Sequence, residues 1–260
     1  MFRRASSVLL ARGAAAMAVG GATVSTLLMT NESSSQASNR LELKYFDGKG
    51  AVETSRLLMA FTNAPFTDTR WKMDMSKPYG QRCNGFMEAK ARGDLAANLD
   101  RAPILLVDGV AIGESKAIER FLARRLGMMG SNEVEAALVD AWCEHVRDIK
   151  SGIQHAPDKV KFVTDTLPAL LKRMEREATS EQAVVGNTRS LADVAMYELV
   201  EEFFPAREAY LLGKGESIGV SIDSATLLHG CPKLAAAVRA VKNHPGVAKH
   251  IRERNYSAPW

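Results

Sequence analysis

The sequence of 260 residues predicts a small mixed α/β domain followed by an all-helical domain. Two observations support this prediction. Between residues 41 and 129, strand and helix patterns follow one another in the order β-α-β and then β-β-α. After Ser131 the strand patterns stop, and only the helical spacing of apolar residues continues. Residues 1–40 match neither pattern, so they are considered as a separate segment.

Residues 1–40 are predicted to be a targeting segment with a polar linker. Their four arginines and single acidic residue carry +3 of the chain's formal net charge of +4. A composition rich in Arg, Ser and Ala and poor in acids is typical of a mitochondrial or plastid presequence. The alternative is a membrane anchor at residues 13–29, a run of 17 uncharged residues, although a spanning helix usually needs about 20 predominantly apolar residues. The Ser-rich stretch 31–39 predicts the linker.

Charge and cysteine usage in the other 220 residues argue against nucleic-acid binding and metal chemistry. These residues carry a formal charge of only +1 with both signs interspersed, which gives no basic stripe for a nucleic acid. The three cysteines lie far apart without a C-x-x-C motif, which suits a reducing compartment and offers no metal framework. The five histidines form no H-x-x-x-H pair either. We therefore expect no metal site.

The first domain begins with a β-α-β pattern. Residues 41–46 alternate between apolar and polar, which predicts a half-buried strand, and a turn follows at 47–50. Apolar spacing from Val52 predicts an amphipathic helix, and residues 67–73 a second strand. The polar segment 74–101 is predicted to be a long loop that contains one short helix around Phe86 to Arg92.

Residues 102–122 predict a β-β-α unit with a free backbone edge. Asp108-Gly109 between two apolar runs is a strong hairpin signal, because both central residues need positive φ. Pro103 has no N–H and suits the start of a strand, so the backbone of Ala102 stays free to pair with another molecule. Ser115 begins a helix whose N–H groups could bind a carboxylate. The unit suits a peptide-like ligand, but from these residues alone an ordinary β-β-α unit is the better interpretation.

The second half of the chain is predicted to be helical throughout. Ser190 and Asp193 form a capping-box pattern at the start of one helix, with Asp in the position where Glu or Gln is usual. The expected helices cover residues 131–153, 160–174, 190–204, 232–241 and 247–254, and the expected loops 179–189 and 214–222.

Four segments, in the same order as in the family, give the chain a resemblance to cytosolic-type glutathione transferases, especially the sigma-class and prostaglandin-D-synthase-like branch. They read LKYFDGKGAVETSRLLMAF, APILLVDGVAIGESKAIERFLARRLGMMG, ALVDAWCEHVRDI and SLADVAMYELV. The resemblance extends over residues 41–255. It implies a thioredoxin-like, glutathione-binding domain at 41–129 and a helical C-terminal domain at 131–260.

The resemblance also implies a role for residues in the first domain. Tyr45 would donate its hydroxyl hydrogen bond to the sulfur of glutathione. Ala102, before Pro103 in a cis peptide, would pair its backbone with the cysteine of the tripeptide. Glu114 and Ser115 would bind the γ-glutamyl group. From spacing alone, Tyr45 fits a core or edge aromatic.

The resemblance also assigns roles to Phe86, Lys90 and Asp148, and the sequence departs from the sigma pattern in two places. Phe86 and Lys90 match an aromatic residue and a lysine near the glycyl carboxylate, within a segment 74–101 that is longer than the sigma pattern. Asp148 matches an acid that reaches the glutathione of the neighbouring subunit, which implies a homodimer; from spacing alone it is a solvated acid. Ala51 stands where the sigma branch usually has an arginine, and Lys49 is one candidate to replace it.

The implied chemistry needs a thiolate. A free thiol with a pKa near 8.5 is only about 3% ionised at pH 7, and a hydroxyl donor aimed at the sulfur lowers that pKa. We therefore expect an enzyme that conjugates glutathione, as a co-substrate, to a small hydrophobic electrophile, with no bound cofactor. The alternatives are a glutathione-dependent isomerase or peroxidase of the prostaglandin-synthase type, and a binding module without turnover.

Overall fold

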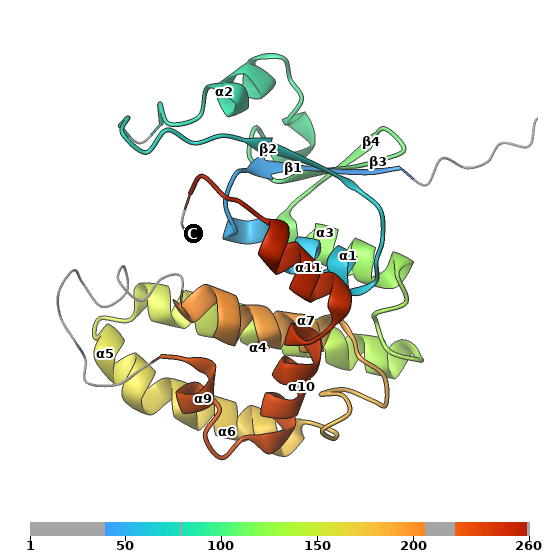
Figure 1. The fold of residues 1–260 in the computed structure, drawn as a ribbon, viewed down its shortest axis with the longest axis vertical. Helices are drawn as coiled ribbons and strands as arrows, with labels where there is room; N and C mark the ends of the chain where they lie inside the picture. Colours follow the sequence, from blue (N-terminus) through green and yellow to red (C-terminus); the bar gives the residue numbers. More distant parts are fainter. Residues whose placement is uncertain (1–39, 79, 206–221, 259–260) are drawn as a thin grey trace, which may run out of the picture. The chain divides into compact units, whose positions relative to one another are not determined.

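The computed structural model describes three stretches of the chain, residues 40–78, 80–205 and 222–258 (Figure 1). Its sheet has four strands in the order β2-β1-β3-β4. The strands are β1 (Leu41–Phe46), β2 (Thr67–Trp71), β3 (Ile104–Val107) and β4 (Val110–Gly113). β1 pairs in parallel with β2 and antiparallel with β3, and β3 pairs antiparallel with β4. The register places Tyr45 opposite Arg70, at the end of β1 from which the chain turns into the first helix.

Helices cover both faces of this sheet (Figure 1). α1 (Glu53–Phe61) follows a short 3-10 turn and packs beside α3 (Ser115–Arg125) on one face. α2 (Asn84–Ala91) lies on the other face, against β2. A second 3-10 turn, Ala96–Asn98, leads from α2 towards β3. This arrangement of strands and helices matches the predicted mixed α/β domain.

The rest of the described chain is helical. Two π-helical turns, Phe162–Thr166 and Glu198–Phe203, continue α5 and α7. The helices are α4 (Glu133–His155), α5 (Lys159–Lys161), α6 (Leu167–Glu177), α7 (Leu191–Tyr197), α9 (Ser224–Leu227), α10 (Pro232–Lys242) and α11 (Pro245–Glu253). No helix in the described stretches is both long enough and apolar enough to cross a membrane.

One apolar core runs through both halves of the described chain. Every residue of α7 is buried, because this helix packs against α4 and α10 and also touches α1 and α3. α11 lies along α1 so closely that a Cβ on Gly246 would come within 2.0 Å of the carbonyl oxygen of Ala60. A smaller cluster of Ala89, Leu95 and Ile104 joins α2 to the opposite face of the sheet. The predicted boundary at 129–131 falls in the turn between α3 and α4 and stays a prediction.

Local sequence signals predicted several details correctly. Asp108 and Gly109 both have positive φ, at 51° and 90°, as the hairpin between β3 and β4 requires. The capping box of Ser190 and Asp193 is present at the start of α7. The N-cap of α4 is Asn132, whose side chain accepts hydrogen bonds from two backbone N–H groups, so this helix begins two residues later than predicted. The targeting segment, the anchor and most of the 214–222 loop lie outside the described residues.

Candidate active site

Tyr45 lies at the edge of a cavity of about 500 Å³ in the α/β domain. Its described lining comes from the ends of β1 and β2, the segment that carries α2, and the residues just before β3. The lining residues are Tyr45, Phe46, Gly48, Met73, Gly80, Arg82, Cys83, Phe86, Met87, Arg101 and Ala102. Chain segments that are distant in sequence therefore meet at one cavity that Tyr45 lines.

The Tyr45 side chain is held by the turn that follows its own strand. The ring packs against Gly50, where a Cβ would come within 2.6 Å of the Tyr45 hydroxyl oxygen, and Gly50 has a φ of +46° that disfavours other residues. The backbone N–H of Ala51 donates a hydrogen bond of 3.1 Å to that hydroxyl oxygen. The hydroxyl oxygen therefore accepts a hydrogen bond from the turn, and the hydroxyl can still donate its own proton in a hydrogen bond to another acceptor.

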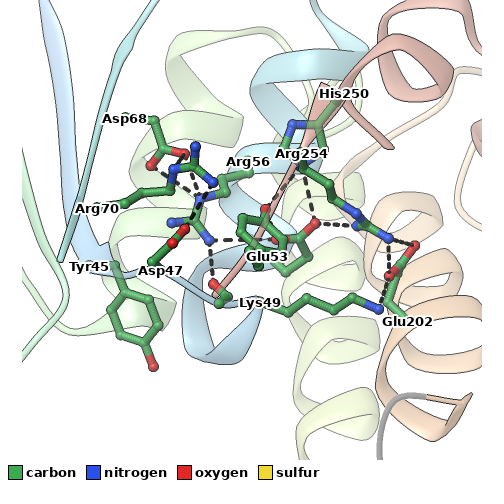
Figure 2. Close-up of polar contacts among 12 residues, drawn as sticks. Tyr45, Asp47, Lys49, Glu53, Arg56, Asp68, Arg70, Glu202, His250 and Arg254 are labelled. Atoms are coloured by element: carbon green, nitrogen blue, oxygen red, sulfur yellow. Dashed lines mark hydrogen bonds and ion pairs between the residues drawn. The ribbon is translucent and has the colours of Figure 1, made fainter. Parts of the chain in front are cut away.

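Lys49 does not replace the arginine that the resemblance led us to expect near Tyr45. Its Nζ forms an ion pair of 2.7 Å with Glu202, a residue of the helical half. In Figure 2 the Lys49 side chain extends towards Glu202, while the Tyr45 hydroxyl points away from both. A backbone N–H, from Ala51, thus takes the place of a charged side chain at this hydroxyl.

The peptide bond between Ala102 and Pro103 is cis, as the resemblance implied. Ala102 lines the Tyr45 cavity, whereas Pro103 is buried and its carbonyl oxygen accepts a hydrogen bond of 3.0 Å from the side chain of Asn98. Ala102 therefore lies at the cavity, and the pairing of its backbone with a ligand stays a prediction.

Glu114 and Ser115 lie at the start of α3, and the hairpin of β3 and β4 separates them from Ala102 in the sequence. Glu114 is the N-cap residue with a φ of 63°, and its carboxylate accepts a hydrogen bond of 2.5 Å from the Arg101 guanidinium. Ser115 is the first residue of the helix, and its hydroxyl has no partner within the described stretches. Arg101 lines the cavity, so it connects Glu114 to that space.

Of the two site residues predicted on α2, the structure places one at the cavity and the other outside it. Phe86 lines the cavity and packs against Phe46 and Trp71, with ring centroids 5.0 and 5.7 Å apart. Lys90 is not among the lining residues; its side chain is 45% exposed and its Nζ lies 3.9 Å from the carboxylate of Asp100. In this structure Phe86 is brought to Tyr45 and Lys90 is not.

Two arginines at the cavity were missed by the sequence analysis. Arg101 directly precedes Ala102, so its position before the Ala-Pro pair was a usable signal. Arg82 comes from the long polar segment, where its side chain donates a hydrogen bond of 2.8 Å to the Lys77 carbonyl oxygen, and nothing in the sequence marked it. Cys83 beside it is buried, and burial raises the pKa of its thiol.

Asp148 lies elsewhere, on α4. Its side chain is 68% exposed and its ion pair within the chain is with Arg147, at 3.4 Å. It lines a second cavity of about 530 Å³ between α4 and α6, whose floor includes Trp142. Within one chain Asp148 and Tyr45 therefore line different cavities.

Beside the turn that follows Tyr45, charged side chains form a buried network (Figure 2). Glu53, at the start of α1, is fully buried and accepts hydrogen bonds from Arg254 at 2.6 Å and from Tyr256 at 2.7 Å. A ring nitrogen of His250 lies 3.2 Å from the same carboxylate. Burial opposes ionisation of Glu53, but the His250 hydrogen bond and the charges of His250, Arg56 and Arg254 outweigh it and lower its pKa to about 2.

The same network holds the turn between β1 and α1. Arg56 is fully buried, pairs with Asp68 at 3.1 Å and donates a hydrogen bond of 2.7 Å to the carbonyl oxygen of Gly48. Glu202 binds Arg254 at 2.8 Å as well as Lys49. Charged groups from both halves of the chain thus converge on the turn that contacts Tyr45.

Comparisons with known proteins agree with this fold. The family model described as "Glutathione S-transferase, C-terminal domain" matches residues 150–254. The chain is 30% identical over 169 residues to glutathione S-transferase P 10 of Caenorhabditis elegans, which covers 62% of this chain and 75% of that protein. It is 29% identical over 171 residues to hematopoietic prostaglandin D synthase of Gallus gallus, covering 58% of this chain and 73% of that one.

Solved structures show the same fold. The Pi-class glutathione S-transferase of Onchocerca volvulus superimposes with a TM-score of 0.62 at 23% identity, covering 82% of this chain and 93% of that one. A thioredoxin-like α/β domain with a helical C-terminal domain, a cavity that a tyrosine lines and these relatives lead to one conclusion. The chain belongs to the glutathione S-transferase family. The predicted resemblance and the predicted fold class are both confirmed.

Proposed function

We propose that this protein binds glutathione in the Tyr45 cavity and transfers it to small hydrophobic electrophiles. The observation that carries the proposal is that Tyr45, whose hydroxyl oxygen receives a hydrogen bond from the Ala51 N–H, lines the same cavity as Ala102. A hydroxyl donor aimed at the sulfur stabilises the thiolate more than the thiol, so the pKa of the bound thiol falls. Lowering the pKa of the thiol by about two units needs only ~2.7 kcal/mol of additional stabilisation of the thiolate.

The reaction we propose needs no general base at the sulfur. The thiol proton leaves to solvent, the Tyr45 hydroxyl keeps its proton and donates a hydrogen bond, and the sulfur lone pair attacks the electrophilic carbon. A C–S bond forms and the leaving group departs with its bonding electrons. Tyrosine suits this role because its phenol O–H is a hydrogen-bond donor.

The charges around the cavity support a negatively charged tripeptide as its occupant. Arg82 and Arg101 both line it, and the N–H groups at the start of α3 begin at Ser115, beside Glu114. Carboxylates bind well to guanidinium groups and to helix N-termini. In this proposal Ser115 and the α3 N-terminus bind the γ-glutamyl carboxylate, and Glu114 binds the γ-glutamyl amine.

The test uses the full chain in two steps. Calorimetry should detect glutathione binding, and an activity panel should then compare a chlorinated nitrobenzene, a hydroperoxide and an endoperoxide as second substrates. Turnover of the nitrobenzene supports conjugation. Turnover of the endoperoxide or hydroperoxide alone favours the isomerase or peroxidase alternative, which the prostaglandin D synthase relative suggests. Binding without turnover of any of the three favours a binding module, and absence of binding ends the proposal.

We also propose a homodimer formed through α4. Val134 and Leu138 on this helix are 64% and 49% exposed, which is unusual for large apolar side chains on a packed helix. An acidic stripe of Asp140 and Glu144 would repel a second copy, but Arg120 of α3 pairs with both carboxylates within the chain. Sedimentation should give a dimer, and Asp148→Asn should weaken glutathione binding more than dimerisation. A fully active monomer would remove Asp148 from the site.

Localisation is proposed from the composition of residues 1–40. A reporter that carries them should enter mitochondria, or plastids in a plant host, and be trimmed before Leu41. Alkaline carbonate extraction should then release the mature protein. Retention of the full-length chain in the membrane pellet would instead favour an anchor at residues 13–29.

A further inference from the structure

The C-terminal tail, residues 254–258, lies against the turn at residues 47–50. The backbone N–H of Ala258 donates a hydrogen bond of 3.0 Å to the Asp47 carbonyl oxygen, and the Ser257 hydroxyl donates to the same oxygen at 3.3 Å. The N–H of Ser257 donates to the Asp47 carboxylate at 3.1 Å. Asp47 is two residues after Tyr45, so the tail binds directly to the chain that leaves the tyrosine.

Ser257 also reaches the neighbouring strand. Its hydroxyl oxygen accepts a hydrogen bond of 3.3 Å from the backbone N–H of Met73, which follows β2. Met73 and Gly48 both line the Tyr45 cavity. One serine therefore joins two segments that form the cavity, from outside it.

The tail is itself anchored in the buried network. Arg254 bridges the carboxylates of Glu53 and Glu202, and Tyr256 donates a hydrogen bond to Glu53. The guanidinium of Arg56 lies 5.2 Å from the centroid of the Tyr256 ring. These contacts fix the tail to α1 and to the helical half, so it can hold the turn in one position.

We propose that residues 254–258 are a positioning element for Tyr45. By holding Asp47, the tail sets the path of the turn through Gly50, and so the contact between the Ala51 N–H and the Tyr45 hydroxyl. This inference rests on the proposed function, since it concerns how strongly Tyr45 stabilises a bound thiolate. Ser257 touches neither the cavity nor the hydroxyl and acts only through the turn.

The experiment compares Ser257→Ala with Ser257→Thr in the full chain. Ser257→Ala loses the hydroxyl's hydrogen bonds to the Asp47 carbonyl oxygen and to the Met73 N–H, while the backbone hydrogen bonds of Ser257 and Ala258 to Asp47 remain. It should lower kcat/KM about threefold to tenfold, the range that one neutral hydrogen bond supports. The loss should shrink as pH rises, because the thiol then ionises unaided, and the apparent pKa in the kcat/KM profile should rise. Ser257→Thr keeps a hydroxyl and should restore the profile. Arg82 and Arg101, the charged groups that line the cavity, are unaltered in both variants.

Tyr256→Phe is the matched control within the tail. It removes the hydrogen bond to Glu53, which lies on α1, and leaves the contacts to Asp47 in place. It should lower the melting temperature and move the pH profile less than Ser257→Ala does, because Arg254 still anchors the tail to Glu53 and Glu202. A chain that ends at Arg254 should show a larger shift than Ser257→Ala; if that shortened chain does not fold, the Ala and Thr variants decide.

An unchanged pH profile in Ser257→Ala would overturn the inference, as would an equal shift in Tyr256→Phe. A wild-type chain that binds no glutathione in calorimetry would instead overturn the proposed function. The two failures are therefore distinguishable.

Discussion

The two sides of the Tyr45 cavity are built in different ways. On the side of α1, the turn at 47–50 is held by a buried ionic network in which Glu53 and Arg56 have no exposed surface. On the side of α2, Phe86, which packs on a small apolar cluster, and the exposed Met87 form part of the wall. Buried ion pairs demand exact geometry, whereas a small apolar cluster tolerates changes of shape. Tyr45, the residue that we propose activates the sulfur, therefore lies on the side with strict geometry. The side that tolerates changes of shape is available for contacts with the ligand.

The largest expected effect comes from breaking the network. Glu53→Gln removes one charge from a group that is paired with Arg254 and near Arg56 and His250. It should lower the free energy of unfolding by about 3–5 kcal/mol, because the remaining charges lose their buried partner. Denaturant unfolding measures this loss. Glu88→Gln, on the exposed face of α2, is the control and should change stability by less than about 0.5 kcal/mol.

The pH dependence of stability sharpens the same comparison. The pKa of Glu53 is lowered from its ordinary value of 4.5 to about 2 in the folded chain, so its ionised form stabilises the fold at neutral pH. That contribution should be lost as pH falls from about 4.5 towards 2, and Glu53→Gln should flatten this part of the stability curve. An equally steep acid loss in the variant would show that other carboxylates control it.

A smaller effect is expected on glutathione binding at the start of α3, which packs on α1. Ser115→Ala removes a hydroxyl that has no partner within the described residues, so the fold should keep its stability. Binding should weaken by about 1–3 kcal/mol, because a carboxylate loses one partner. Calorimetry measures this, with Ser131→Ala in the turn before α4 as the control. Equal affinities of the two variants would remove Ser115 from the site.

The smallest effect is expected on the α2 side. Lys90 is half-exposed and outside the cavity, so Lys90→Ala should change glutathione affinity by less than about 0.5 kcal/mol. The resemblance assigned this lysine to the glycyl carboxylate, and the same calorimetry tests that role. A loss as large as that of Ser115→Ala would mean that α2 turns Lys90 towards the ligand on binding.

The sequence predicted what short stretches of chain determine. The hairpin at Asp108-Gly109 and the capping box at Ser190 follow from residues within a few positions of one another. The contact between Asp47 and Ser257 joins residues 210 positions apart, and no local pattern indicates it. The donor to the Tyr45 hydroxyl could not be predicted from the sequence either, because it is a backbone N–H, which every residue but proline carries.

The acidity of the glutathione thiol in the complex tests the central claim most directly. The thiolate absorbs in the ultraviolet, so a pH titration of the glutathione complex measures the pKa of the bound thiol in the wild-type chain and in Tyr45→Phe. Tyr45→Phe keeps the ring against Gly50 and removes only the donor. We predict a pKa about two units below that of free glutathione in the wild type, and a return to the value of free glutathione in the variant, with affinity nearly unchanged. The same lowered pKa in both chains would contradict the account and assign the activation of the sulfur to another group.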